Sequence, residues 1–74
     1  MAESVILFPS THYAISADRE LTKKEIPHKL APIPRNMSSN CGYCIRIERS
    51  FSGQVSDLFR EKGIEIEGIV EITG

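Results

Sequence analysis

The chain contains few of the residues that mark several large classes of protein. Its 74 residues include no tryptophan, three phenylalanines, two tyrosines and two cysteines. Two cysteines cannot build the disulfide framework of a small secreted domain, so we expect a cytoplasmic protein with reduced thiols. Nine basic and ten acidic residues give a net charge of −1. Nucleic acid and anionic membranes attract a concentrated positive field, so we expect neither as a partner.

Long hydrophobic runs are also missing. The longest apolar run covers residues 5–8, whereas a helix that spans a bilayer needs about 20 apolar residues. The N-terminal MAESV has neither the basic region nor the apolar stretch of a signal peptide. The sequence has no Gly-rich phosphate loop, and we expect no cofactor. A chain of this length is expected to form a single domain over residues 1–74.

Strand and helix patterns alternate along the chain. Period-two and 3.6-residue patterns predict strands over residues 5–8, 28–33, 41–48 and 64–72, and helices over 11–24 and 51–62. This order predicts an α+β fold, the ferredoxin-like β-α-β-β-α-β sandwich, with a four-stranded antiparallel sheet and two helices on one face. The first and third strands are expected in the middle of the sheet.

The strand patterns also predict which residues are buried. In the third strand one face is expected to be buried, with Tyr43 at the start of the buried row. In the last strand Val70 and Ile72 are expected on the inner face, in one row with Ile64 and Ile66, and Ile69 on the outer face. The first strand is apolar on both faces, and such strands are usually covered on both sides. We therefore expect a second copy to cover part of the open sheet face in a homodimer.

The segment SSNCGYC contains both cysteines, Cys41 and Cys44. Because the first and third strands are predicted to be antiparallel neighbours, the start of the third strand lies beside the end of the first. Cys41 is therefore expected near the amino end of the first helix, close to Ser10, Thr11 and His12. Ser10 and Thr11 are more typical of helix caps than of reactive groups.

A thiol at this position is a candidate nucleophile. The amino end of a helix carries partial positive charge and unpaired amides, which lower the pKa of a nearby thiol below its usual value of about 8.5. Arg35 and Arg46 are further candidates for stabilising a Cys41 thiolate, and Gly42 is small enough to let a second molecule approach. His12, if it faces Cys41, could move a proton to or from the sulfur. The alternative is a half-buried cysteine at the end of a strand.

The CxxC spacing leaves two other interpretations open. Residues three apart in a strand point to opposite faces, so Cys41 and Cys44 can form a dithiol couple only if Cys41 and Gly42 form a turn. Tetrahedral zinc needs four ligands, and the remaining candidates, His12 and His28, are expected at opposite ends of the sheet. We therefore expect no metal site within one chain.

Four stretches, FPSTHYA, PIPR, SSNCGYCIRI and GIEIEGIVEI, occur in an order and spacing that resemble a family of small, largely uncharacterised bacterial and archaeal proteins described as selenium or sulfur carrier-like. The resemblance covers nearly the whole chain. At the position of Cys44 the family usually has a small apolar residue. The features that carry over are Pro9, Ser10, Thr11, His12, Pro34, Arg35, Ser39, Cys41, Gly42 and Arg46.

The resemblance implies a carrier in which Cys41 accepts sulfur or selenium as a persulfide-type group. It implies two partners, a donor protein and an acceptor protein, and any enzymatic character would be that of a sulfurtransferase-like carrier. Two alternatives remain. One is a non-catalytic interaction or small-ligand-binding module, and the other is a thiol-disulfide protein that uses Cys41 and Cys44 together.

Overall fold

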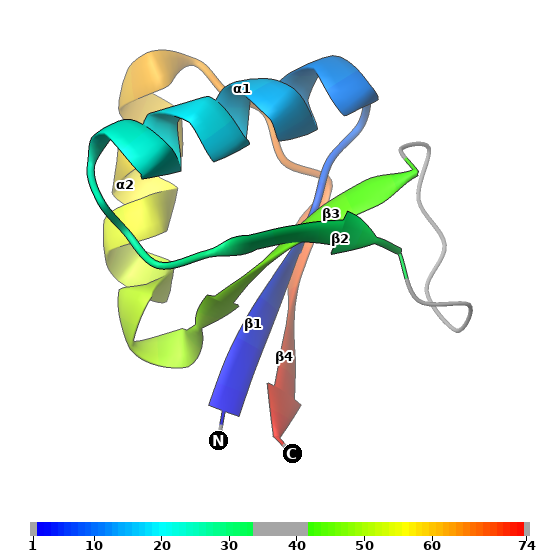
Figure 1. Ribbon diagram of the computed structural model, residues 1–74, viewed down its shortest axis with the longest axis vertical. Helices are drawn as coiled ribbons and strands as arrows, with labels where there is room; N and C mark the ends of the chain where they lie inside the picture. Colours follow the sequence, from blue (N-terminus) through cyan, green and yellow to red (C-terminus); the bar gives the residue numbers. More distant parts are fainter. Residues whose placement is uncertain (1, 34–41, 74) are drawn as a thin grey trace.

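The computed structural model describes residues 2–33 and 42–73 (Figure 1). The four strands form one antiparallel sheet in the order β2-β3-β1-β4, and both helices lie on one face of it (Figure 1). This confirms the predicted ferredoxin-like α+β fold and the central position of the first and third strands. The elements are β1 (Ala2–Leu7), α1 (Thr11–Lys23), β2 (Lys29–Pro32), β3 (Tyr43–Glu48), the 3-10 turn η1 (Arg49–Phe51), α2 (Ser52–Lys62) and β4 (Gly68–Thr73).

The core lies between the helices and the inner face of the sheet. α1 buries Ala14, Ala17 and Leu21, which follow one helical stripe. Phe8, directly after β1, and Phe59 of α2 meet in the centre with their ring centroids 6.0 Å apart. The other core residues are Ile6, Ile26, Ile45, Ile47, Val55, Leu58 and Ile64.

Among the described residues, no helix is long and apolar enough to cross a membrane.

A second, smaller cluster lies on the outer face of the sheet. Val5, Leu7 and Cys44 are buried there, and Ile33 and Ile72 pack against them. The second half of β1 is therefore buried on both faces within a single chain, and the expected cover by a second copy stays a prediction. The prediction that β3 has one buried face is wrong, because Cys44 on the opposite face is fully buried as well.

The predicted faces of Ile69, Val70 and Ile72 are also wrong, whereas Ile64 and Ile66 lie at the core between helices and sheet as predicted. Residues 64–67 form no strand, and β4 begins at Gly68. Ile69 packs against the core between helices and sheet, whereas Ile72 packs against the outer cluster. Val70, paired with Val5 of β1, is 37% exposed. The prediction counted the alternation of inner and outer side chains through residues that form no strand. The count then no longer matches the register of β4, and its inner and outer faces are exchanged.

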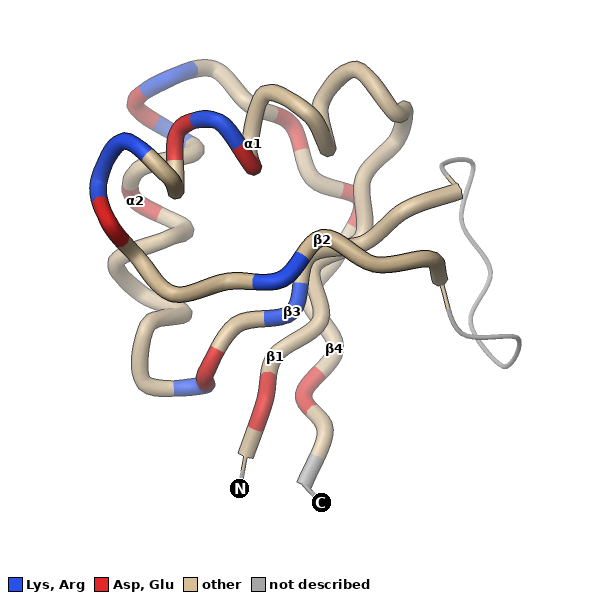
Figure 2. Tube along the Cα trace, in the orientation of Figure 1, with Lys and Arg blue, Asp and Glu red and all other residues tan. Residues whose placement is uncertain are grey.

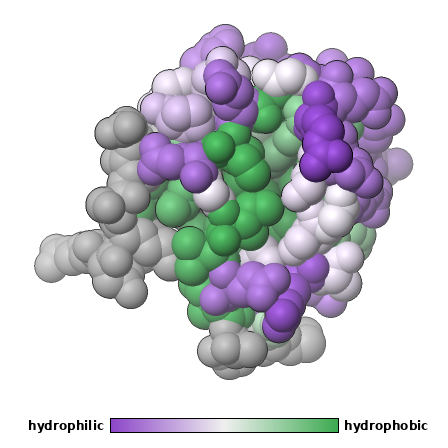
Figure 3. Space-filling view, turned by 180° about the vertical axis from the view of Figure 1, so that it is seen from behind, coloured by the Kyte–Doolittle hydropathy of each residue, from purple (hydrophilic) through white to green (hydrophobic). Residues whose placement is uncertain are grey.

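Charged and hydrophobic surfaces are unevenly distributed. The first half of α1, the end of β2 and the start of β3 carry no acidic or basic residue, and charged residues occupy the second half of α1 and the free ends of β1 and β4 (Figure 2). On the side hidden in Figure 1, hydrophobic residues form a continuous band between hydrophilic regions (Figure 3).

Candidate functional site

The amino end of α1 and the start of β3 lie at the same end of the molecule (Figure 1). The pairing of β1 with β3 ends with Leu7 opposite Cys44, and the chain then passes through Pro9 into α1. Ser10 is the N-cap residue, as predicted, and Ala14 N donates to its carbonyl oxygen over 3.3 Å. Within the described part of the chain, however, the Ser10 hydroxyl makes no capping hydrogen bond.

Two of the candidate site residues, Cys41 and Arg35, lie outside the described residues. Their location relative to α1 therefore stays a prediction. Ile33 and Gly42, which flank this segment, are joined by a hydrogen bond in which Ile33 N donates to Gly42 O over 3.2 Å. Gly42 is exposed, and within the described structure a Cβ added there would have no heavy atom within 4 Å.

An apolar hollow of about 410 Å³ lies between the first half of α1 and the β2–β3 pair. Its walls are Thr11, Ala14, Ile15, Leu30 and Tyr43. Thr11 is thus on the side of α1 that faces the start of β3. Because Tyr43 directly follows Gly42, the hollow lies next to the predicted position of the nucleophile.

Tyr43 corrects another prediction. It has the same strand parity as Ile45 and was expected in the buried row, but its side chain is 44% exposed. Tyr43 lines the apolar hollow together with Thr11, Ala14 and Ile15 of α1, so the space above this part of β3 is open and is not filled by the helix. Strand alternation gives the direction of a side chain, but its burial depends on the size of what lies opposite.

His12 lies on another flank of α1. Its exposed ring packs edge-on against Tyr13, with centroids 5.6 Å apart, and it borders a hollow of about 250 Å³ with Ser16 and residues 62–64. Thr11 and His12 therefore line different hollows. The structure places Thr11, but not His12, beside Tyr43.

Tyr13 was not singled out by the sequence. Its hydroxyl donates to Glu65 Oε2 over 2.8 Å and ties α1 to the segment before β4. This hydrogen bond, together with the negative charge of Glu65 and some burial, raises the pKa of Tyr13 above 10.0. No local pattern could have found the pair, because 52 positions separate the two residues.

Arg46 lies on the outer face of β3 and is engaged within the sheet. Its Nη2 donates to Glu3 Oε2 over 2.8 Å. It is four residues along the chain from Gly42, which corresponds to roughly 13 Å at the rise of an extended strand. In the described structure the buried Nε of Arg46 has no hydrogen-bond partner.

Cys44 is fully buried, and its Sγ lies 3.8 Å from the carbonyl oxygen of Pro32.

His28, the other histidine considered as a metal ligand, contacts protein atoms through both ring nitrogens. Its Nδ1 lies 2.8 Å from Ile26 O, and its Nε2 lies 2.6 Å from Asp18 Oδ1. Among the described residues, no group of three or more His, Cys, Asp or Glu side chains could hold a metal ion.

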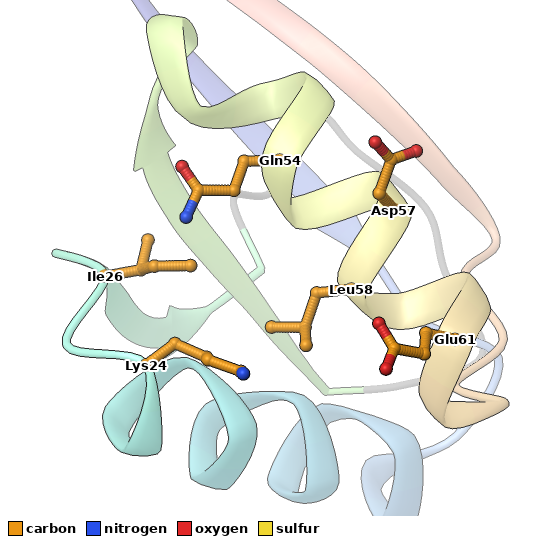
Figure 4. Close-up of a pocket in the computed structure, with 6 residues that line it drawn as sticks. All are labelled: Lys24, Ile26, Gln54, Asp57, Leu58 and Glu61. Carbon is orange, nitrogen blue, oxygen red and sulfur yellow. The ribbon is translucent and has the colours of Figure 1, made fainter.

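A third depression, of about 220 Å³, lies between the carboxyl end of α1 and α2 (Figure 4). Leu58 points into the space between the two helices, whereas Asp57 points away from it (Figure 4). No residue of the predicted site lies here. The other lining residues are Lys24, Ile26, Gln54 and Glu61.

The fold and the junction of α1 with β3 define a small ferredoxin-like protein with a candidate site at one end of its sheet. A family model described as "Putative Se/S carrier protein-like" matches residues 3–71. The chain belongs to this family, which confirms the resemblance seen in the sequence. Searches of curated proteins and of solved structures gave no significant match.

Proposed function

We propose that this protein carries sulfur or selenium, and that Cys41 holds the cargo atom as a persulfide-type group. The observation that carries the proposal is membership of the Se/S carrier-like family over residues 3–71. A carrier needs a nucleophilic sulfur, stabilisation of the negative charge on the outer atom, and access for two proteins in turn.

The transfer itself needs no net oxidation. The Cys41 thiolate attacks the outer sulfur of a persulfide on the donor protein, and a new S–S bond forms as the donor's S–S bond breaks. The donor cysteine leaves as a thiolate, and Cys41 now bears the persulfide. The acceptor's nucleophile attacks the outer sulfur of Cys41 in the second step, and the Cys41 thiolate is the leaving group.

The geometry around the start of β3 supports this role. β3 starts at the end of the molecule where α1 begins (Figure 1). Cys41 is two residues before Tyr43, the first residue of β3, and consecutive Cα atoms are about 3.8 Å apart. The first turn of α1 contains no acidic residue, so its partial positive charge is not offset there. The space next to Gly42 in the described structure leaves room for a partner.

The environment of Cys44 supports assigning the reaction to Cys41. Cys44 is 0% exposed and packs with Val5 and Leu7, so it occupies the apolar position that the resemblance implies. A nucleophile must reach its partner's sulfur, and a thiol walled by aliphatic side chains cannot. Cys44 therefore packs the outer face, and the other cysteine of the chain carries the cargo.

Mass spectrometry of the intact protein tests the proposal. The purified chain is incubated with a cysteine desulfurase and cysteine, or with selenocysteine as the selenium source. We expect the mass of one sulfur or selenium atom to be added at Cys41 and removed by a thiol reductant. Cys41→Ser should remain folded and gain nothing, whereas Cys44→Ala should gain the same mass. An unchanged mass of the wild-type chain would overturn the proposal.

A second candidate is a non-catalytic module that forms a homodimer through its apolar surface. The hydrophobic band in Figure 3 and the 37% exposure of Val70 favour it. Sedimentation at high micromolar concentration should then show a dimer that Cys41→Ser leaves intact. A strict monomer at that concentration would count against this candidate.

A further inference from the structure

We propose that the apolar hollow is the docking site for the protein that delivers sulfur to Cys41, and that it receives an uncharged, apolar loop of this donor. The inference rests on the proposed carrier function and adds where, and through what chemistry, the donor binds. The hollow is formed by Thr11, Ala14, Ile15, Leu30 and Tyr43.

Exposed hydrophobic side chains concentrate at the hollow. Four large hydrophobic residues are exposed among the described part of the chain, and three of them line it: Ile15 at 48%, Leu30 at 36% and Tyr43 at 44%. Single exposed apolar residues are common on soluble proteins and need no explanation. Three of them around one concavity are typical of an interaction site.

The absence of charge fixes the chemistry of the partner. Residues 4–17, 30–33 and 42–45 contain no Asp, Glu, Lys or Arg, so the walls of the hollow are uncharged, and charged side chains gather elsewhere (Figure 2). A charged group of the partner would lose its hydration here without gaining a counter-charge, which is unfavourable. Complementarity therefore favours an apolar, uncharged loop.

The extent of the surface favours a transient partner over a second copy. With 36–48% of three side chains exposed, the apolar area is at most a few hundred Å², whereas a stable interface buries about 800 Å² on each partner. A carrier must release its donor before it meets its acceptor, and a small interface suits that exchange.

The position of the hollow also suits sulfur delivery. Tyr43 is two residues from Cys41, so their Cα atoms are at most about 7 Å apart. A donor loop bound against Tyr43 would therefore hold the donor's persulfide close to the accepting sulfur. The hollow of about 410 Å³ has room for several apolar side chains of such a loop.

A matched pair of substitutions tests the inference. Ile15→Glu places a charge in the hollow at an exposed helix position, and Val70→Glu places the same charge at an exposed position outside it. For each variant, the rate of Cys41 loading from a persulfide-charged cysteine desulfurase is divided by the rate of loading from inorganic polysulfide. We expect this ratio to fall at least about tenfold for Ile15→Glu, a loss of about 1.4 kcal/mol in donor recognition, and to stay within about twofold of wild type for Val70→Glu.

Each outcome decides between the two proposals. An unchanged ratio for both Ile15→Glu and the milder Ile15→Ser would overturn the docking site while leaving the carrier function intact. Failure of the wild-type chain to load from either source would overturn the carrier function, and the docking site with it. Dissociation of a wild-type dimer by Ile15→Glu, seen by sedimentation, would show that a second copy occupies the hollow and overturn the donor assignment. Circular dichroism checks that each variant is folded.

Discussion

Replacing Cys44 with alanine tests whether this cysteine only packs the outer cluster or also takes part in redox chemistry with Cys41. The substitution removes a fully buried sulfur from the outer cluster. A buried group the size of a methylene contributes about 0.8 kcal/mol, and a cavity that the neighbours fill only partly adds to the loss. We expect the free energy of unfolding to fall by about 1–2 kcal/mol. For a domain of this size, that corresponds to a decrease in Tm of roughly 5–15 °C.

Cys44→Ser should be at least as destabilising. The variant replaces the thiol with a hydroxyl among Val5, Leu7 and Ile72. A buried hydroxyl without a hydrogen bond costs about 1–3 kcal/mol. The carbonyl oxygen of Pro32 lies 3.8 Å from the present sulfur, and the shorter C–O bond would leave the hydroxyl of serine farther from it.

The assay combines stability with chemistry in the same samples. Urea unfolding followed by circular dichroism gives the loss of stability, and mass spectrometry gives sulfur loading at a temperature where each variant is folded. We expect both Cys44 variants to load at Cys41 as the wild type does. A folded Cys44→Ala that fails to load would refute the packing assignment and favour the dithiol alternative. Alkylation of Cys44 as fast in the native protein as in urea would refute the burial argument itself.

Three further predictions concern the contacts that hold the site's scaffold. Glu65→Gln should lower the raised pKa of Tyr13 toward 10.0, because it removes the negative charge and weakens the hydrogen bond that raise it. A raised pKa means that folding favours the neutral phenol, so this contribution to stability is present below the unfolded pKa and is lost as pH rises through the folded pKa. NMR titration of the Tyr13 ring measures the midpoint, and the same midpoint in both proteins would contradict the assignment. Gly63→Ala should cost about 1 kcal/mol in urea unfolding, because Gly63 ends α2 in the left-handed region with φ 69°; unchanged stability would argue against that conformation. His28→Ala should lower stability by about 1–2 kcal/mol, because the ring bridges Asp18 of α1 and the chain before β2; a double-mutant cycle with Asp18→Asn that gives no coupling energy would show that the contact is not formed in solution.

The sequence predicts the element order well, because each element has a strong local pattern. Ala14, Ala17 and Leu21 follow one helical stripe, and all three are buried in α1. The four apolar residues at 5–8 predict a strand covered on both faces, and all four are buried. The second helix was predicted to end at residue 62, and α2 does end there, with Gly63 following in the left-handed conformation.

The errors arise where burial depends on partners far along the chain. Tyr43 has the parity of a core residue, but it lines the open hollow between α1 and the β2–β3 pair and is exposed. Ile69 was placed on the outer face because the alternation was counted through residues 64–67, which form no strand. Neither the length of β4 nor the side chains that face Tyr43 can be read from neighbouring positions. The apolar hollow was missed for the same reason, since its walls come from three elements.

The boundary at the start of β3 bears on the proposal that Cys41, and not Cys44, carries the cargo. Cys44 belongs to the sheet, where it is paired with Leu7 of β1 on one side and with Ala31 of β2 on the other. A persulfide on Cys44 would need space for a second sulfur atom in a cluster where the first is already fully buried. It would also require two partner proteins to displace packed side chains in turn. Gly42 precedes the strand, is exposed, and has open space within the described structure. If this chain carries a persulfide, the cargo therefore has to sit on a cysteine outside the outer cluster, and Cys41, which precedes β3 in the sequence, is the candidate that we propose.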